Sequence, residues 1–168
     1  SEGPGQTTLT SNDGGYNFLF ILTDQEQYMG YTWPFSVPGH ERLRRTGTFF
    51  ENHHIAADMC SASRAVIYTG LHQPLNGIFD NAGVPYMKSL DPGLPTVGKI
   101  LRELGYYTAY KGKFHLNGAI AMENRADDIR ALFERTMDRD YGFFDYTGTG
   151  DYIEGALGGY QYDQITTA

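Results

Sequence analysis

The sequence predicts a doubly wound α/β fold, in which helices flank a mostly parallel sheet. Short apolar runs of strand length alternate with segments of helical periodicity. Glycines stand where the helical segments end, and polar residues follow the strand-like runs directly. The expected order is strand, helix, strand, helix, loop, helix, strand, which suits a parallel sheet with crossover helices.

The first strand is expected over residues 17–23, an almost continuous apolar run typical of a strand buried on both faces. Residues 38–46 predict a helix, with a proline near its start and Gly47 at its end. Residues 48–55 alternate loosely between apolar and polar side chains, which predicts a second strand.

The next helix is expected from about residue 61 to residue 69, ending at Gly70. Residues 71–92 are rich in Gly, Pro and Asn, which predicts a long surface loop. Residues 95–104 show the clearest helical pattern, with Gly105 as the C-terminal cap. The apolar residues on one face of this helix are Val97, Ile100, Leu101 and Leu104.

The last elements are a strand over residues 106–110 and a charged amphipathic helix over residues 125–139. Residues 142–160, rich in glycine and tyrosine, are expected to form a loop over the sheet. Residues 163–168 resemble the first turn of a helix, capped by an aspartate, that nothing follows.

The domain organisation follows from these elements. Residues 1–15 are expected to form a flexible leader, since they lack the basic and apolar regions of a signal peptide. Residues 16–168 contain few strands, whereas a parallel sheet needs both faces and most edges covered. We therefore expect these residues to be a fragment of a larger protein, with an incomplete α/β domain.

Composition excludes some functions and leaves the compartment open. The net charge of −7 argues against a nucleic-acid partner, because no basic stripe is present. No apolar run is long enough to span a bilayer, and a single cysteine cannot form an internal disulfide. An enzyme that acts on anionic esters would need a metal ion or local positive charge to offset this field.

The single cysteine stands where a predicted strand gives way to a predicted helix. Backbone N–H groups and the helix dipole favour an anion at a helix N-terminus, where Cys60 lies. Arg64, one turn later, has a planar guanidinium suited to a tetrahedral oxyanion. The pair predicts a site for attack on a sulfate or phosphate ester.

Other candidate residues also follow predicted strands. Asp24 ends the first strand, and Lys113 and His115 come after the last one. Ligands of open α/β sheets gather outside the carboxyl ends of the strands. These side chains are therefore expected to belong to the same site as Cys60.

In order along the chain, three segments resemble the N-terminal half of the sulfatases in the alkaline phosphatase superfamily. They are Asn17 to Gln25, the motif Cys60-Ser-Ala-Ser-Arg64 with Thr69-Gly70-Leu71, and Leu94 to His115. The resemblance implies an alkaline phosphatase-like fold and hydrolysis of a sulfate monoester. It further implies that residues 16–168 are the N-terminal portion of the catalytic domain, so that the isolated chain, without the C-terminal half, should be inactive. It also implies that Cys60 is converted to formylglycine, whose hydrated form supplies the attacking oxygen.

The same resemblance assigns the metal ligands. Asp24, Gln25 and the modified Cys60 would ligate a divalent cation, usually calcium, with manganese or magnesium as alternatives. A hard cation of this kind prefers oxygen ligands. As a Lewis acid it polarises ester oxygens and lowers the pKa of a bound hydroxyl.

The remaining roles divide between catalysis and substrate binding. By resemblance, Arg64 would orient the modified residue, and Lys113 and His115 would bind sulfate oxygens and stabilise the leaving group. The pair Asp24-Gln25 with the downstream Asp-Asn-Ala resembles the choline sulfatase and phosphonate monoester hydrolase branch. Asn81 would then line the substrate pocket, or alternatively form only its own Asx turn.

The motif departs from the family's usual Cys-x-Pro-x-Arg, since Ala62 replaces the proline. The expected maturation partner is a formylglycine-generating enzyme or an anaerobic sulfatase-maturing enzyme, of which the anaerobic type accepts alanine. Two alternatives to a sulfatase stay open. One is a phosphonate or phosphodiester hydrolase on the same scaffold, and the other is a sulfatase-like protein without catalysis.

Overall fold

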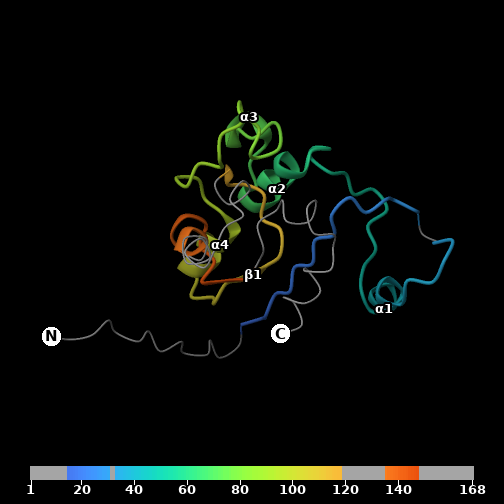
Figure 1. Cartoon of the computed structure of the whole chain (residues 1–168). Coiled ribbons are helices and arrows are strands. Elements are labelled where there is room, and N and C mark those ends of the chain that lie inside the picture. Colours follow the sequence, from blue (N-terminus) through green and yellow to red (C-terminus); the bar gives the residue numbers. More distant parts are fainter. Residues whose placement is uncertain (1–14, 31–32, 119–134, 148–168) are drawn as a thin grey trace. The chain divides into compact units, whose positions relative to one another are not determined.

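The computed structural model describes residues 15–30, 33–118 and 135–147, and it shows the side chains of these residues up to residue 144. The chain divides into two units. One consists of residues 17–55. The other consists of residues 1–16 and 56–168, and it contains most of the regular structure among the described residues (Figure 1). Within the described ranges, no helix is both long and apolar enough to cross a membrane.

Helix α1, Pro38–Thr46, is the regular element of residues 17–55 and confirms the predicted helix. Its first turn is closed by Glu41, whose Oε1 accepts from Ser36 Oγ at 3.2 Å and from the Val37 N–H at 3.3 Å. This carboxylate satisfies donors that every helix start leaves open. The helix ends at Gly47, whose N–H donates to the Leu43 carbonyl at 2.8 Å.

The predicted strands over residues 17–23 and 48–55 are wrong for this structure, because neither range forms a ladder. The apolar side chains of the first run are exposed, with Leu19 at 86% and Ile21 at 69%. A strand buried on both faces needs neighbouring strands and covering helices. The described residues of this unit supply only α1, so the run is extended chain rather than a sheet strand.

Helix α2, Cys60–Thr69, confirms the helix expected before Gly70, which caps it in the left-handed region at φ 69°. The loop predicted over residues 71–92 contains one turn of helix, α3, Gln73–Asn76. The His72 carbonyl accepts from the N–H groups of Leu75 and Asn76, which forms this turn. Helix α2 packs against both α3 and α4.

Helix α4, Val97–Glu103, begins two residues later than predicted, because the Thr96 side chain caps it by accepting from the Lys99 N–H. Its apolar face is largely exposed, with Ile100 at 46% and Leu104 at 63%. The buried residue is Gly98 instead. At Gly98 the backbone of α4 therefore packs against the backbone of Tyr141 and Gly142, whereas its apolar side chains make little contact with the core.

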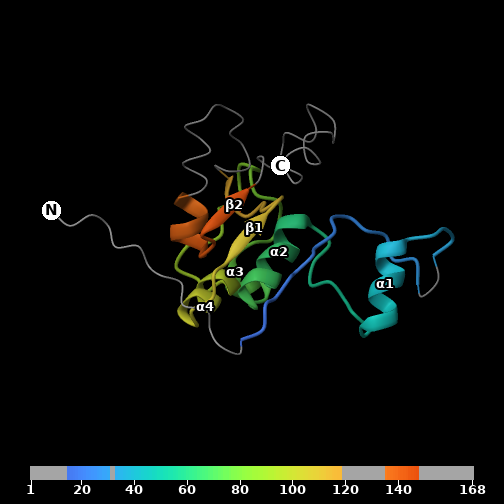
Figure 2. The ribbon, with the colours of Figure 1, turned by 90° about the horizontal axis from the view of Figure 1, so that it is seen from below.

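Strands β1, Ala109–Lys111, and β2, Asp145–Thr147, form a two-stranded parallel sheet with Ala109 opposite Asp145 (Figure 2). Strand β1 confirms the strand predicted at residues 106–110 with a shifted boundary. Strand β2 lies inside the loop predicted over residues 142–160. The parallel pairing agrees with the predicted fold class, but the larger sheet expected is not present among the described residues.

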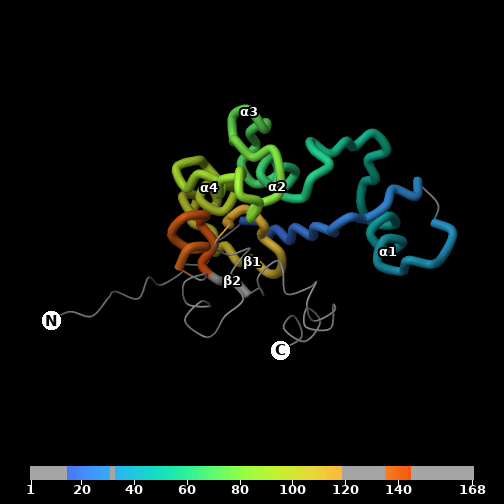
Figure 3. Tube along the Cα trace, turned by 45° about the horizontal axis from the view of Figure 1, so that its top comes forward, coloured from blue at the N-terminus to red at the C-terminus, as the bar shows by residue number. Residues whose placement is uncertain are grey.

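A π-helical turn, η1, Met137–Tyr141, overlaps the end of the helix predicted over residues 125–139 and extends two residues beyond it. Figure 3 shows this turn beside α4. Residues 135–136 of that predicted helix are helical, and its residues 125–134 lie outside the described residues. The leader up to residue 14 and the final turn over residues 163–168 lie outside them as well. A cluster of buried side chains joins α2, η1 and the segment after β1. It includes Tyr68, Leu90, Phe114, Leu116, Met137, Tyr141 and Phe143.

Tyr141 is the largest fully buried side chain of this core. Its hydroxyl donates to the Leu90 carbonyl at 3.1 Å and accepts from Asn117 Nδ2 at 3.2 Å. Burial raises the pKa of this phenol to about 12, against a small lowering effect of the Asn117 hydrogen bond. The folded state therefore holds the proton that the unfolded chain releases near its ordinary pKa of about 10.

This burial predicts a specific alkaline sensitivity. Below pH 10 the phenol is protonated in both states, and its full contribution to the free energy of unfolding is present. Between pH 10 and about 12 this contribution decreases by about 1.4 kcal/mol per pH unit, because only the unfolded chain releases the proton. Denaturant unfolding of the wild type and of Tyr141→Phe at a series of pH values checks this. The difference in unfolding free energy between them should change above pH 10, and a constant difference would contradict the prediction.

Candidate active site

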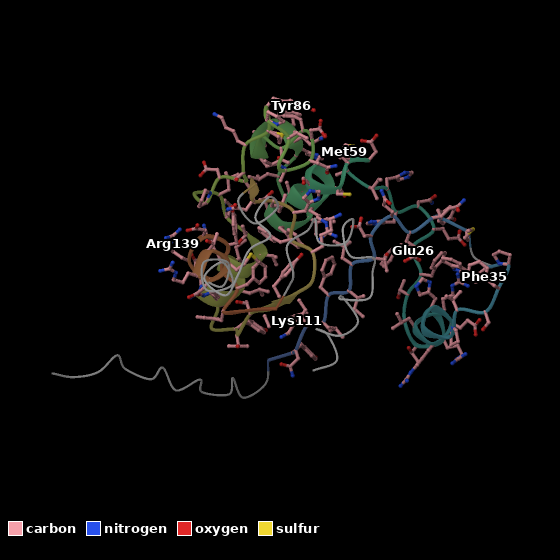
Figure 4. All side chains as sticks on the ribbon, viewed as in Figure 1. Glu26, Phe35, Met59, Tyr86, Lys111 and Arg139 are labelled. Carbon is pink, nitrogen blue, oxygen red and sulfur yellow. The ribbon has the colours of Figure 1, made fainter. Side chains whose placement is uncertain are left out.

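Cys60 is the first residue of α2, at the helix N-terminus that the sequence predicts. Met59, labelled in Figure 4, precedes it and has extended backbone. The cysteine side chain is half-buried. The residues that follow are deeply buried, with Ser61 and Ala62 at 0% exposure. The helix therefore holds the candidate nucleophile at the rim of the core, at the positive end of the helix dipole.

Ser61 ties the start of α2 to two other segments. Its Oγ donates to the carbonyl of His115 at 2.5 Å and accepts from the Ala82 N–H at 2.9 Å. Its backbone N–H donates to Oδ1 of Asn81 at 3.2 Å. The side chain of Asn81, from a loop distant in the chain, thus satisfies a backbone donor in the first turn of α2. It does this rather than form an Asx turn of its own.

The loop that carries Asn81 is held by its neighbour Asp80. The Asp80 carboxylate accepts from the hydroxyl of Tyr86 and from the Asn81 N–H, the latter at 2.7 Å. The bond from Tyr86 and then that from the backbone lower the pKa of Asp80. Tyr86, labelled in Figure 4, has its pKa raised by the same contact. The carboxylate therefore stays ionised and fixes the turn that presents Asn81.

Arg64 lies one turn below Cys60 and is 6% exposed. Its Nη1 donates to the carbonyl of Lys113 at 2.6 Å and approaches the Tyr110 hydroxyl at 3.4 Å. The sequence predicts this guanidinium as a partner of an oxyanion or of the modified cysteine. In the structure it binds the backbone of the segment that contains the other two predicted catalytic residues.

Two tyrosines that the sequence analysis did not identify support the same segment. The hydroxyl of Tyr110 donates to the Lys113 carbonyl at 2.5 Å, and the Tyr68 hydroxyl lies 2.6 Å from that of Tyr110. Arg64, Tyr68 and Tyr110 are called the carbonyl network below, because they converge on the carbonyl of Lys113. A tyrosine in a short strand carries no pattern that distinguishes this role from packing.

The segment Lys113-Phe114-His115 is anchored at each residue. The Phe114 ring is 1% exposed and packs on Tyr141 with ring centroids 4.7 Å apart. His115 is 6% exposed, and its backbone has φ +55°. A non-glycine residue in this left-handed region persists only where its surroundings hold it.

Asp24 and Gln25 belong to residues 17–55, the other unit of the chain. Gln25 has φ +52°, and it and His115 are the non-glycine residues with positive φ in the described part of the chain. Both are predicted site residues, which agrees with the tendency of strained backbone to occur at functional sites.

Asp24 and Gln25 fit the predicted metal in donor chemistry, because a carboxylate and an amide supply the oxygens that hard cations prefer. They are a partial set, since such a cation takes about six to eight oxygens. Across residues 15–30, 33–118 and 135–147, no three His, Cys, Asp or Glu side chains gather into a metal site.

The structure thus joins Cys60, Arg64, Asn81, Lys113 and His115 through hydrogen bonds of Ser61 and the carbonyl network. Cys60, half-buried at the start of α2, is tied through Ser61 to the segment that carries the side chains of Lys113 and His115. A thiol, an ammonium group and an imidazole are side-chain types suited to attack on an anionic ester.

Comparison with known proteins gives the family. The sulfatase family model matches residues 16–168. The mouse steryl-sulfatase is 36% identical over 112 residues, which are 60% of this chain and 18% of that protein.

Two bacterial proteins are also similar. The uncharacterised sulfatase YidJ of Escherichia coli is 30% identical over 110 residues, 61% of this chain and 20% of that protein. The choline-sulfatase of Rhizobium meliloti is 29% identical over 145 residues, 83% of this chain and 25% of that protein. The chain therefore spans a quarter or less of the length of these relatives.

Proposed function

The chain belongs to the sulfatase family, and we propose that it is the N-terminal portion of an enzyme that hydrolyses sulfate monoesters. The observation that carries the proposal is the attachment of the segment Lys113–His115 to the N-terminal turn of α2. Two backbone carbonyls of that segment accept hydrogen bonds from Ser61 and Arg64, the neighbours of Cys60. The family implies the alkaline phosphatase-like α/β fold for the complete domain.

Each residue has a stated task in this proposal. The residue derived from Cys60 attacks sulfur, and the N-terminal turn of α2 favours the anion there. Lys113 and His115 bind sulfate oxygens and stabilise the charge that develops on the leaving alcohol. Asn81 holds the helix start through Ser61 and offers its amide N–H groups to the substrate.

Two groups supplied after synthesis complete the chemistry. Conversion of Cys60 to formylglycine supplies a hydrated aldehyde oxygen as the nucleophile. Asp24, Gln25 and the modified residue would hold a divalent cation, with calcium as the first choice, which polarises the ester oxygens. The remaining ligands would come from the C-terminal half of the full-length protein.

Ala62 bears on maturation. Its side chain is 0% exposed within α2, so the helix accommodates alanine where the family usually has proline. An anaerobic sulfatase-maturing enzyme, which accepts alanine, is therefore the proposed partner. A tryptic peptide of the native protein that contains Cys60 should show a mass loss of about 18 Da.

The second candidate function is hydrolysis of a phosphonate monoester or phosphodiester. The feature that supports it is the pair Asp24-Gln25 together with Asn81, which resembles the phosphonate monoester hydrolase branch of the family. Asn81 Oδ1 accepts from the Ser61 N–H in the first turn of α2. Lys113 and His115 favour the sulfate ester instead.

A comparison of rates with the full-length, matured protein separates the two functions. We expect kcat/KM for an aryl sulfate to exceed that for the matching aryl phosphonate by at least about tenfold. A reversed ratio would support the phosphonate hydrolase. Substrate binding without turnover of either ester, in protein with confirmed formylglycine, would support a sulfatase-like protein without catalysis.

A further inference from the structure

The carbonyl of Lys113 is the point at which α2 and the segment after β1 are held together. It accepts from Arg64 Nη1 at 2.6 Å and from the Tyr110 hydroxyl at 2.5 Å. A backbone carbonyl has two lone pairs, so these two donors fill its hydrogen-bonding capacity. The Lys113 backbone is therefore fixed from α2 and from β1 at once.

The direction of the bonds in the carbonyl network follows from the number of protons. A phenol has one proton, and that of Tyr110 goes to the Lys113 carbonyl. At 2.6 Å the Tyr68 hydroxyl must then donate to the oxygen of Tyr110. Tyr68 on α2 thus polarises Tyr110 and strengthens its bond to Lys113, since hydrogen bonds in a chain reinforce one another.

Ring packing holds the Tyr110 hydroxyl in place independently of these bonds. The Tyr110 ring meets Phe114 edge-on at 5.6 Å and Phe143 at 5.1 Å, and it meets Tyr68 at 5.8 Å. Removing the hydroxyl therefore leaves the ring contacts intact. The two roles of Tyr110, packing and hydrogen bonding, can be separated by a single substitution.

We propose that Tyr110, supported by Tyr68, is a positioning residue that sets the place of Lys113 and His115 relative to the nucleophile on α2. This inference rests on the proposed function of those two residues. Only Phe114, whose ring is buried, separates Lys113 from His115 in the chain, and the His115 carbonyl accepts from Ser61. A shift of the Lys113 carbonyl is therefore transmitted to both candidate catalytic side chains.

The first test uses Tyr110→Phe in the full-length, matured protein, with substrates whose leaving alcohols differ in pKa. Lys113 and His115 act on the leaving group, so misplacing them should affect poor leaving groups most. We expect kcat/KM for an alkyl sulfate to fall about tenfold, and that for an activated aryl sulfate to fall less than about threefold. Formylglycine content should stay near wild type. Tm should fall by only a few degrees, because the hydrogen bonds of one hydroxyl are lost while the ring contacts remain.

Two further variants are the controls for this test. Tyr68→Phe removes the donor to Tyr110 and should show the same dependence on the leaving group with a smaller amplitude. Tyr107→Phe also removes a phenol, but its ring stacks on Phe144 away from the carbonyl network, and it should behave as wild type. An equal fall on both classes of substrate, or wild-type rates for Tyr110→Phe, would overturn the inference.

A binding measurement tests the inference without turnover. Calorimetry with inorganic sulfate is performed on the wild type, Tyr110→Phe, Lys113→Ala and the double variant. If Tyr110 acts through Lys113, the loss in affinity from Tyr110→Phe should disappear once Lys113 is truncated. Additive losses would overturn the inference. If the wild type binds sulfate but hydrolyses no sulfate ester, only the proposed function is contradicted. The four affinities still measure the coupling between Tyr110 and Lys113.

Discussion

Cys60→Ala in the full-length protein should abolish sulfate-ester hydrolysis, with kcat/KM reduced by at least about 10⁴-fold. Covalent catalysis depends on the nucleophile, and alanine cannot be converted to an aldehyde. Alanine is well tolerated at the first position of a helix, and Cys60 is only half-buried. The loss should therefore appear in the rate and not in the folding of α2.

Two measurements separate loss of the nucleophile from loss of structure. The Tm of Cys60→Ala should lie close to that of the wild type, and inorganic sulfate should still bind. Wild-type protein made without a maturing enzyme should be as inactive as Cys60→Ala, because both lack the aldehyde. Activity of Cys60→Ala that matches the matured wild type would exclude Cys60 as the source of the nucleophile. The same activity in unmatured wild type would exclude formylglycine as the form in which Cys60 acts.

Gly142→Ala should produce the largest loss of stability from a single methyl group, about 3 kcal/mol or more. Gly142 has φ +84°, which is unfavourable for alanine. A Cβ at this position would also lie 2.6 Å from the Gly98 carbonyl carbon and inside contact distance of the Lys99 nitrogen. These are backbone atoms of α4 and cannot rotate away.

Substitutions at two other glycines separate the cost of the positive φ from the cost of the steric clash. Gly105 has φ +86°, and a Cβ there would meet nothing within 4 Å, so Gly105→Ala should show the conformational cost alone, about 1–2 kcal/mol. Gly98 lies in a helix, and its Cβ would be 2.6 Å from the Tyr141 carbonyl oxygen, so Gly98→Ala should show the steric cost alone. Denaturant unfolding measures all three, and a loss of stability in Gly142→Ala no larger than in Gly105→Ala would contradict the steric argument.

Local signals in the sequence predict α1, α2 and α4, but not the single turn α3, which lies inside a predicted loop. Gly47 and Gly70 end α1 and α2 as expected. Gly70 does so in the left-handed region that favours glycine, whereas Gly47 has extended backbone that other residues also adopt. The strands are predicted poorly. A ladder needs a partner segment, and the apolar run over residues 17–23 has no described partner that would make it a strand.

In the candidate site, too, residues that belong to a sequence motif could be predicted, whereas residues whose roles depend on spatial neighbours could not. The motif around Cys60 and the pair Lys113 and His115 are identifiable, since their residue types and spacing carry the resemblance. The roles of Tyr68, Tyr110 and Ser61 are not, because they depend on which backbone carbonyl lies opposite in space. The metal ligands Asp24 and Gln25 stay a prediction, in a unit described separately from Cys60.

The bond from Ser61 to the His115 carbonyl joins residues 54 apart in the chain. Contacts of this separation close late in folding, because the entropy of the intervening loop must first be lost. During synthesis the chain through Arg64 emerges well before residue 115. For the maturation proposed above, a modifying enzyme would act on Cys60 in the interval before the Ser61 bond to the His115 carbonyl forms.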